Sequence, residues 1–225
     1  MGDHVREPEL GGEAQLVCDE MAKRARQNVE ELVQRLEREG YRFHQNDDDE
    51  TPLNPHCPPT ARAPDFAVWL ENQFTRVPMT LLSWVRIVGD VWLVGTHPEW
   101  KDSASGDPLV IELEGSLHPD YGPIQDHFVA SHDEWVEWKA ENPDAGPFVL
   151  PVSPDHLHKA NTSGGSPYGF ILPDGCADGL FVDEVAMPFV SYLNWVFGHG
   201  GFPRDIEGTE QWRVRRTLAK DLLPL

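Results

Sequence analysis

Two histidines stand two residues apart in Asp155-His156-Leu157-His158, and this spacing is a candidate for metal chemistry. On an extended strand residues i and i+2 share one face, so both imidazoles could bind one ion. Asp155 or His97 could complete the ligand set, with a neighbouring acid as the general base of a small metal-dependent hydrolase. Pro151 and Pro154 make the local backbone irregular, however, and no third ligand is fixed by spacing. The hydrolase is therefore the alternative function, and we expect no metal site.

The cysteines and a glycine-rich segment are weaker candidates for chemistry. Cys57 follows His56, but adjacent side chains usually point apart, and the surrounding prolines predict a mobile loop. Cys176 lies in a turn between acids, which disfavours a thiolate nucleophile. The segment Ser163-Gly164-Gly165-Ser166 lacks the lysine and the following amphipathic helix of a phosphate loop. We therefore expect no catalytic residue and no cofactor.

The polar segment from His158 to Tyr168 predicts a binding loop. Lys159, Asn161 and Tyr168 gather around a glycine-rich turn, and such loops present hydrogen-bonding groups to a ligand or partner. The alternative is that Asn161 and Thr162 only bond their own backbone and hold the turn. Loop composition does not separate these two interpretations.

Acidic residues dominate the charge, with 38 Asp and Glu against 18 Lys and Arg, a net charge of -20. This balance argues against binding nucleic acid through its phosphates. Two acidic clusters are candidate sites for a basic protein partner, because opposite charge accelerates encounter. The alternative is that these acids only solvate the surface. The first cluster contains Asp47, Asp48, Asp49 and Glu50, and the second contains Asp133, Glu134 and Glu137.

The elements that must position these residues are organised around the stretch from Val77 to Trp100. Pro78 suits the first turn of a helix, and Gly89 can end it in the left-handed conformation. A short strand is predicted at 91–94. The apolar face of the helix is too wide to stay uncovered, so other elements must pack on it. That face contains Leu81, Leu82, Trp84, Val85 and Val88.

The rest of the chain predicts an α+β domain, with N-terminal helices followed by a mixed or antiparallel sheet and interspersed short helices, because strand and helix do not alternate regularly. Further helices are predicted at 13–39, 65–74, 133–141 and 189–197, the third of them after a capping box formed by Ser131 and Glu134. Strands are predicted at 109–114, 128–130, 148–152, 169–172 and 180–182. The predicted organisation is a flexible N-terminus at 1–12, one domain at 13–203 with an acidic, proline-rich loop at 44–64, and a C-terminal tail at 204–225.

The expected cellular compartment follows from the targeting and membrane-spanning segments that the sequence lacks. The N-terminus has no apolar signal region, and no run approaches the roughly 18 apolar residues of a membrane span. The three cysteines are odd in number and share no redox or metal spacing. We expect a cytoplasmic protein that binds no membrane, and the sequence does not indicate its oligomeric state.

The stretch from Val77-Pro78 through Trp84 to Gly89-Asp90 resembles the opening of the SUKH superfamily, which includes fungal cell-wall assembly regulators and many bacterial immunity proteins. Val77 stands where members typically have Leu, and Gly-Asp replaces their Gly-Gly or Asn-Gly. The resemblance covers about 66–113. It implies an α+β domain without catalytic residues that often neutralises a toxin by binding it.

The whole chain is also similar to a set of uncharacterised bacterial proteins, which implies no activity. They share segments equivalent to 40–43, 96–100, 107–110, 158–165 and 200–203. From the residues and the superfamily together, we expect a non-enzymatic protein-binding module, an immunity protein against a basic toxin. The alternatives are the metal-dependent hydrolase and a structural or regulatory subunit.

Overall fold

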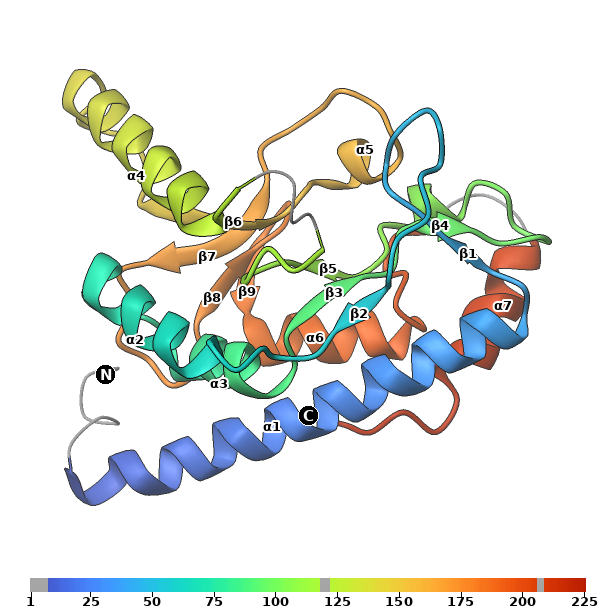
Figure 1. Ribbon diagram of the computed structural model, residues 1–225, viewed down its shortest axis with the longest axis horizontal. Helices are drawn as coiled ribbons and strands as arrows, with labels where there is room; N and C mark the ends of the chain where they lie inside the picture. The colour runs from blue at the N-terminus through green and yellow to red at the C-terminus, as the bar shows by residue number, and fades with distance from the viewer. Residues whose placement is uncertain (1–7, 118–121, 206–208) are drawn as a thin grey trace.

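A long helix, α1 (Pro8–Arg38), runs along one side of a group of small antiparallel sheets (Figure 1). The structure is a computed structural model that describes residues 8–117, 122–205 and 209–225. Within these ranges the chain forms one α+β domain, as predicted. None of the described helices is both long and apolar enough to cross a lipid bilayer.

Helix α1 buries one stripe of side chains, chiefly against α3 (Met79–Ile87), and much of its remaining surface is polar, with Leu16 and Val17 exposed near its start. Buried residues recur every three or four positions, at Ala22, Ala25, Val29, Leu32 and Leu36. The helix begins at Pro8 rather than at the expected residue 13, and a proline suits the first turn. Residues 1–7 lie outside the described ranges.

Helix α3 lies at the centre of the core, as its sequence predicts. Leu81, Trp84 and Val85 have no exposed surface, and the Trp84 indole donates a hydrogen bond to the Gly89 carbonyl at 2.9 Å. Gly89 has the predicted left-handed conformation, with φ of 87°. Its missing Cβ matters because a side chain there would lie 2.3 Å from the Cys57 carbonyl oxygen. Helix α2 (Ala63–Phe74) precedes α3 and packs beside it.

Three antiparallel sheets lie above these helices. The largest has the order β6 (Phe148–Ser153), β7 (Tyr168–Leu172), β8 (Leu180–Val182), β9 (Ala186–Pro188). The second is β2 (His56–Cys57), β3 (Asp90–Trp92), β5 (Val110–Ile111), and the third pairs β1 (Arg42–Phe43) with β4 (Gly95–Thr96). Helix α6 (Phe189–Gly198) covers the four-stranded sheet through Phe189, which contacts Phe170 edge-on at 4.8 Å. A 3-10 turn, η2 (Ser103–Gly106), precedes β5.

Helix α4 (Ile124–Glu141) projects from the body at the upper left of Figure 1. The predicted strand at 128–130 is wrong, because this segment belongs to α4. The predicted capping box is also wrong, since Ser131 lies in the middle of the helix and Pro123 precedes its first turn. No proline or glycine interrupts 124–141, so a helix that starts at Ile124 propagates through to Glu141.

The segment expected to be a tail, 204–225, contains helix α7 (Thr209–Ala219), which packs on α1. Val214 and Leu218 are buried, and the amide of Asn28 in α1 exchanges two 2.8 Å hydrogen bonds with the backbone of Leu223. The loop at 44–64 is also less irregular than expected, because β2 pairs with β3 and Leu53 packs against a small apolar cluster. Both corrections have one cause: scattered apolar residues in a polar stretch find partners distant in sequence.

Candidate functional site

The first acidic cluster lies in a tight loop, residues 45–51, that its own hydrogen bonds hold. The Asp47 carboxylate accepts from the Thr51 hydroxyl at 2.6 Å and from the Thr51 backbone N–H at 2.9 Å. These bonds, the hydroxyl first, hold the pKa of Asp47 below its usual range. Glu50 pairs with Arg42 at 3.0 Å. Asp48, Asp49 and Glu50 are exposed, so the loop presents carboxylates to solvent.

The His-x-His pair lies on a short helix, α5 (His156–Lys159), rather than on a strand. Asp155 caps this helix, accepting from the Leu157 N–H at 2.8 Å, and its second oxygen accepts a hydrogen bond from the His158 ring. Burial alone would raise the pKa of Asp155, but the bonds from His158 and from backbone N–H groups lower it. This contact occupies Nδ1 of His158 and leaves Nε2 directed away from Asp155.

The acidic loop and the polar segment after α5 touch each other. The Asn46 amide donates to the His158 carbonyl at 2.7 Å, and the Asn161 amide donates to the Asp48 carboxylate at 2.6 Å. Two segments more than a hundred residues apart, each predicted separately as a partner-binding site, therefore form one surface. We name residues 45–51 and 158–167 together the two-loop face.

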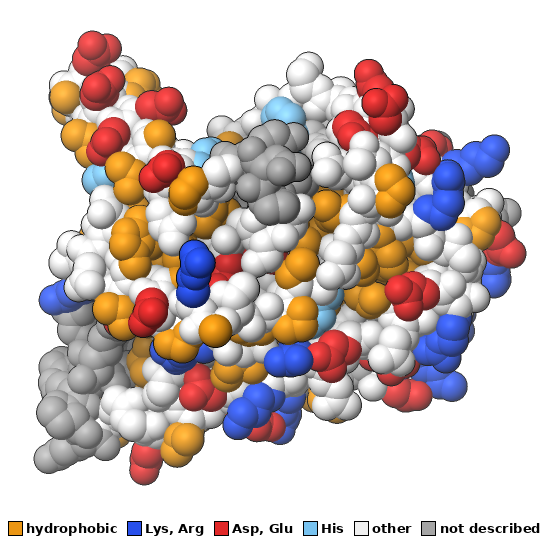
Figure 2. All heavy atoms as spheres, viewed as in Figure 1, with side chains coloured by type: hydrophobic (Ala, Val, Ile, Leu, Met, Phe, Trp, Pro, Cys, Tyr) orange, Lys and Arg blue, Asp and Glu red, His pale blue; other side chains and the backbone are white. Residues whose placement is uncertain are grey.

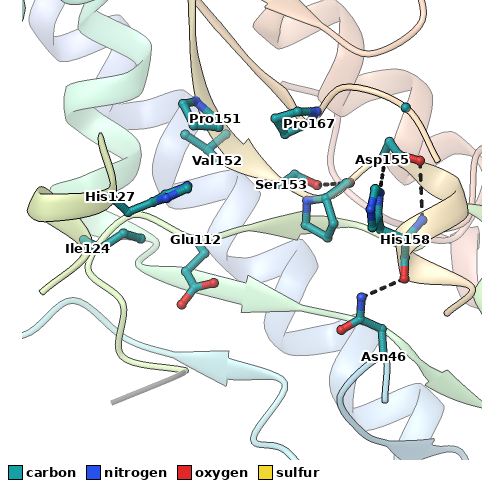
Figure 3. Close-up of a pocket in the computed structure, with 12 residues that line it drawn as sticks. Asn46, Glu112, Ile124, His127, Pro151, Val152, Ser153, Asp155, His158 and Pro167 are labelled. Carbon is teal, nitrogen blue, oxygen red and sulfur yellow. Dashed lines mark hydrogen bonds and ion pairs between the residues drawn. The ribbon is translucent and has the colours of Figure 1, made fainter. Parts of the chain in front are cut away.

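A cavity of about 370 Å³ opens at the foot of the two-loop face (Figure 3). His127 from α4 and His158 from α5 lie on opposite sides of it, with Glu112 between them in this view. Prolines form much of its remaining wall: Pro151, Pro154 and Pro167. A concave, partly apolar site with a few convergent polar groups can hold a side chain or a small ligand.

Glu112 is the most perturbed acid of this cavity. Burial, and secondly the nearby Asp90 carboxylate, raise the pKa of Glu112 from about 4.5 to about 8. Asp90 is itself buried, and it accepts hydrogen bonds from the backbone N–H groups of Leu113, Glu114 and Ser116 at 2.7–3.0 Å. Asp90 thus fixes the bend after β5, and this bend places Glu112 at the cavity wall.

Two residues that the sequence placed on the partner surface lie beneath it instead. Lys159 and Tyr168 are buried, and the Lys159 ammonium pairs with the Asp107 carboxylate at 2.6 Å, 4.8 Å from the centre of the Tyr168 ring. The Tyr168 hydroxyl donates to the other Asp107 oxygen at 3.2 Å and accepts from the His156 N–H at 3.1 Å. The expectation of direct partner contact is therefore corrected: these residues support the two-loop face.

The second acidic cluster lies apart from the first. Asp133, Glu134 and Glu137 are exposed on the outward side of α4, opposite its buried Phe128. Figure 2 shows acidic side chains gathered separately on the projecting end of α4 and on the loop at the upper right. The structure therefore offers two distinct acidic surfaces instead of one continuous acidic patch.

The histidine set of the hydrolase alternative is not assembled. His97 is buried and pairs with Glu39 at 3.0 Å, while His156 faces Tyr168 and Glu184, with its Nδ1 at 3.2 Å from the Tyr168 hydroxyl oxygen. His158 faces Asp155 instead. Across the described ranges no group of three or more His, Cys, Asp or Glu side chains could hold a metal ion.

Sequence reasoning missed three acids that shape the site: Asp90, Asp107 and Glu112. Glu112 belongs to an alternating stretch, which predicts an acid facing solvent. Asp107 precedes Pro108 and reads as an ordinary loop residue, yet it has a left-handed φ of 58° and accepts the buried Lys159. A buried lysine needs an acid partner, but the sequence does not indicate that Lys159 is buried, so no local pattern points to Asp107.

No protein family matches this chain, and no curated protein or solved structure matches it either. What the molecule binds therefore has to follow from its own surfaces. The two-loop face has ordered polar groups, exposed charge and an adjacent cavity, whereas the acids of α4 lie beside the exposed side chains of Val136 and Trp138 on a single helix.

Proposed function

We propose that this chain is a non-enzymatic protein-binding module that binds a basic partner through the two-loop face. The observation that carries the proposal is the contact between the two loops, in which Asn161 donates to Asp48 beside an open cavity. The resemblance to SUKH immunity proteins supports the same function. A cytoplasmic protein that neutralises a basic toxin by binding it is the form of this function that we propose.

The fixed conformation of the acidic loop favours a role in binding a partner over a role in solvating the surface. Flexible surface acids lose side-chain entropy when a partner holds them, and this loss weakens association. Here Asp48 and Glu50 are already held, by Asn161 and by Arg42. Each has spare carboxylate lone pairs, so a basic side chain of the partner can bind without breaking these contacts. Preorganised acids of this kind suit a steered and specific encounter.

The cavity provides a place for buried contacts, which surface charge alone does not make. Long-range attraction raises the rate of encounter, but buried contacts set the lifetime of a complex. A protruding side chain of the partner could enter the space between His127 and His158, while the exposed acids bind at the rim. A partner with basic residues around one projecting side chain is therefore the best fit to this surface.

The test compares matched variants of the two acidic surfaces against the partner that co-purifies from the native host. One variant carries Asp48→Asn, Asp49→Asn and Glu50→Gln, and the other carries Asp133→Asn, Glu134→Gln and Glu137→Gln. Each removes three exposed acids, and Asp47 is kept because it holds the loop. Surface plasmon resonance should show an on-rate about tenfold lower for the first and within about twofold of wild type for the second.

Salt should reproduce the effect, because the Debye length falls from about 30 Å at 0.01 M to about 8 Å at 0.15 M. The wild-type on-rate should fall with salt, while the off-rate changes little. The exchange Asp48→Asn with Asn161→Asp keeps both charge and the contact, so it should bind normally. A loss of binding confined to the α4 variant would move the partner site to α4. An on-rate indifferent to salt and to both variants would contradict electrostatic recognition.

A further inference from the structure

A second cavity, of about 430 Å³, has Tyr168 in its wall and shares no lining residue with the cavity at the two-loop face. The turn between β8 and β9, the helix α6 and the segment 203–205 form its walls. Asp107 and Tyr168 of the buried network also line it. This cavity plays no part in the proposed partner binding, and its residues indicate a ligand of their own.

Tyr192 of α6 lies behind the wall of this cavity and is not one of its lining residues. Its ring is 6.4 Å from the ring of Trp195, which does line the cavity. The side chain is 1% exposed, and among the described residues its hydroxyl has no hydrogen-bond partner. Because this hydroxyl is buried, a ligand in the cavity does not reach it, and Tyr192→Phe can serve as a control.

The cavity walls carry more negative than positive charge. Four acids line it, Asp107, Asp183, Glu184 and Asp205, against one lining arginine, Arg204. Three of the acids have cationic partners: Asp107 pairs with Lys159, Glu184 with Arg204, and Asp205 with Arg215.

Asp183 differs from these three acids. One of its oxygens accepts from the Val185 N–H at 2.7 Å, and among the described residues it has no cationic partner. The surplus charge of the cavity therefore resides at Asp183.

An indole provides the apolar wall of the cavity. Trp195 is 38% exposed, although α6 holds its backbone rigidly, and its neighbours are the His199 ring at 6.0 Å and the Tyr192 ring at 6.4 Å. The face of an indole attracts organic cations through its quadrupole. A carboxylate and an indole that line one cavity are groups that recognise an ammonium or guanidinium ion.

We propose that this cavity binds an organic cation, an ammonium or guanidinium group on a short alkyl stem. Its charge would lie between the Asp183 carboxylate and the Trp195 indole, which line the same cavity. The surplus carboxylate disfavours an anion. The cation belongs either to a free amine or to a Lys or Arg side chain of another protein, and both present the same chemistry.

The experiment measures binding of small probes to the full chain by calorimetry and by the indole N–H signals of the NMR spectrum. The cationic probes are butylamine and agmatine, and butyrate and butanol are their anionic and neutral matches. Capped Gly-Lys-Gly and Gly-Arg-Gly peptides test the side-chain source. We expect saturable binding of the cations and none of butyrate or butanol. Tighter binding of agmatine identifies a free amine as the ligand, and tighter binding of a peptide identifies a side chain.

Two substitutions locate the site: Asp183→Asn and Trp195→Leu should each weaken cation binding about tenfold. Tyr192→Phe, behind the cavity wall, and Trp138→Leu on α4 are the controls, and both should leave binding unchanged. Butyrate binding as well as butylamine, or cation affinity unchanged in both cavity variants, would overturn the proposal. So would an equal loss of binding in the two controls, because the cavity residues would then not define the site.

Discussion

The two acidic surfaces of this protein have the same chemistry in the sequence and opposite settings in the structure. Asn46 and Asn161 make the hydrogen bonds that join the loop at 45–51 to the segment 158–167. The buried Lys159–Asp107 pair holds that segment in turn. Helix α4 is attached along one side, where Phe128 is its one buried residue and Trp135 contacts Phe148 at 5.9 Å. The helix projects from the body (Figure 1), and its acids are exposed.

This difference shows that the polar groups beneath a charge cluster decide whether its carboxylates are held in place. On α4 the acids are separated from the body by the helix itself, and their exposed neighbours on the helix include Val136 and Trp138. In the loop the acids share hydrogen bonds with a second segment, and a buried ion pair holds that segment in turn. Charge density alone would have ranked the two surfaces as equals.

The largest effect should come from removing the lysine beneath the two-loop face. Lys159→Met leaves the Asp107 carboxylate buried and unpaired, so the free energy of unfolding should fall by about 3–5 kcal/mol in urea denaturation. Lys139→Met on α4 is the matched control, because Lys139 only donates to carbonyls such as Pro143 at 2.9 Å, which water can reach. We expect that control to cost less than about 1 kcal/mol. Equal losses of unfolding free energy in both variants would show that the buried ion pair does not distinguish the two acidic surfaces.

A smaller, pH-dependent effect should distinguish the acid of the cavity from an acid of α4. In the folded chain the pKa of Glu112 is raised from about 4.5 to about 8, so between these pH values the unfolded chain ionises while the folded chain keeps its proton. The unfolded state then binds fewer protons, and the contribution of this group to stability falls as the pH rises. The decline should total about 2–4 kcal/mol by pH 8.

Glu112→Gln should remove this decline, and denaturation from pH 5 to pH 8 measures it as a flatter stability profile. Glu137→Gln on α4 serves as control and should leave the wild-type profile in place, because that side chain is exposed. A Glu112→Gln profile that still parallels wild type would show that the cavity does not hold the protonated acid.

The smallest effect should come from the contact between the loops. Asn161 has a left-handed φ of 54°, so Asn161→Gly keeps the backbone geometry and removes only the amide that donates to Asp48. The contact is exposed, and we expect a stability loss of about 0.5 kcal/mol, with hydrogen exchange several-fold faster at 45–51. Asn142→Gly, which removes a similar amide at the end of α4, should leave exchange of the acidic loop unchanged. An unchanged rate of hydrogen exchange at 45–51 in Asn161→Gly would show that the hydrogen bond from Asn161 does not order the acidic loop.

The sequence predicted the parts of the fold that local periodicity controls. Helix α3, its end at Gly89 and the strand β8 lie where the apolar spacing and glycine placed them. Helix α4 was divided wrongly, because Phe128-Val129-Ala130 has strand-forming residues and its helical state depends on residues to either side. Helix α7 was taken for a tail, because only its contact with α1 reveals that Val214 and Leu218 are core residues.

The site was predictable where side chains are exposed and unpredictable where they are buried. Asp48 and Asn161 were chosen as surface groups and are exposed. Lys159 and Tyr168 were chosen on the same grounds, but their surroundings come from η2 and β7, which sequence spacing does not bring together. The contact between the two loops joins residues 113 positions apart, and no local pattern encodes it.

The position of α1 also has a consequence for how the chain reaches its native state. This helix precedes the other described elements, and the surfaces that cover its buried stripe come from α3, α6 and α7, the last of them at 209–219. The Asn28 amide is paired only when the backbone of Leu223 is present. During translation the part of the stripe that α6 and α7 cover therefore stays exposed after α3 has been made, and exposed apolar surface of this kind is what chaperones bind.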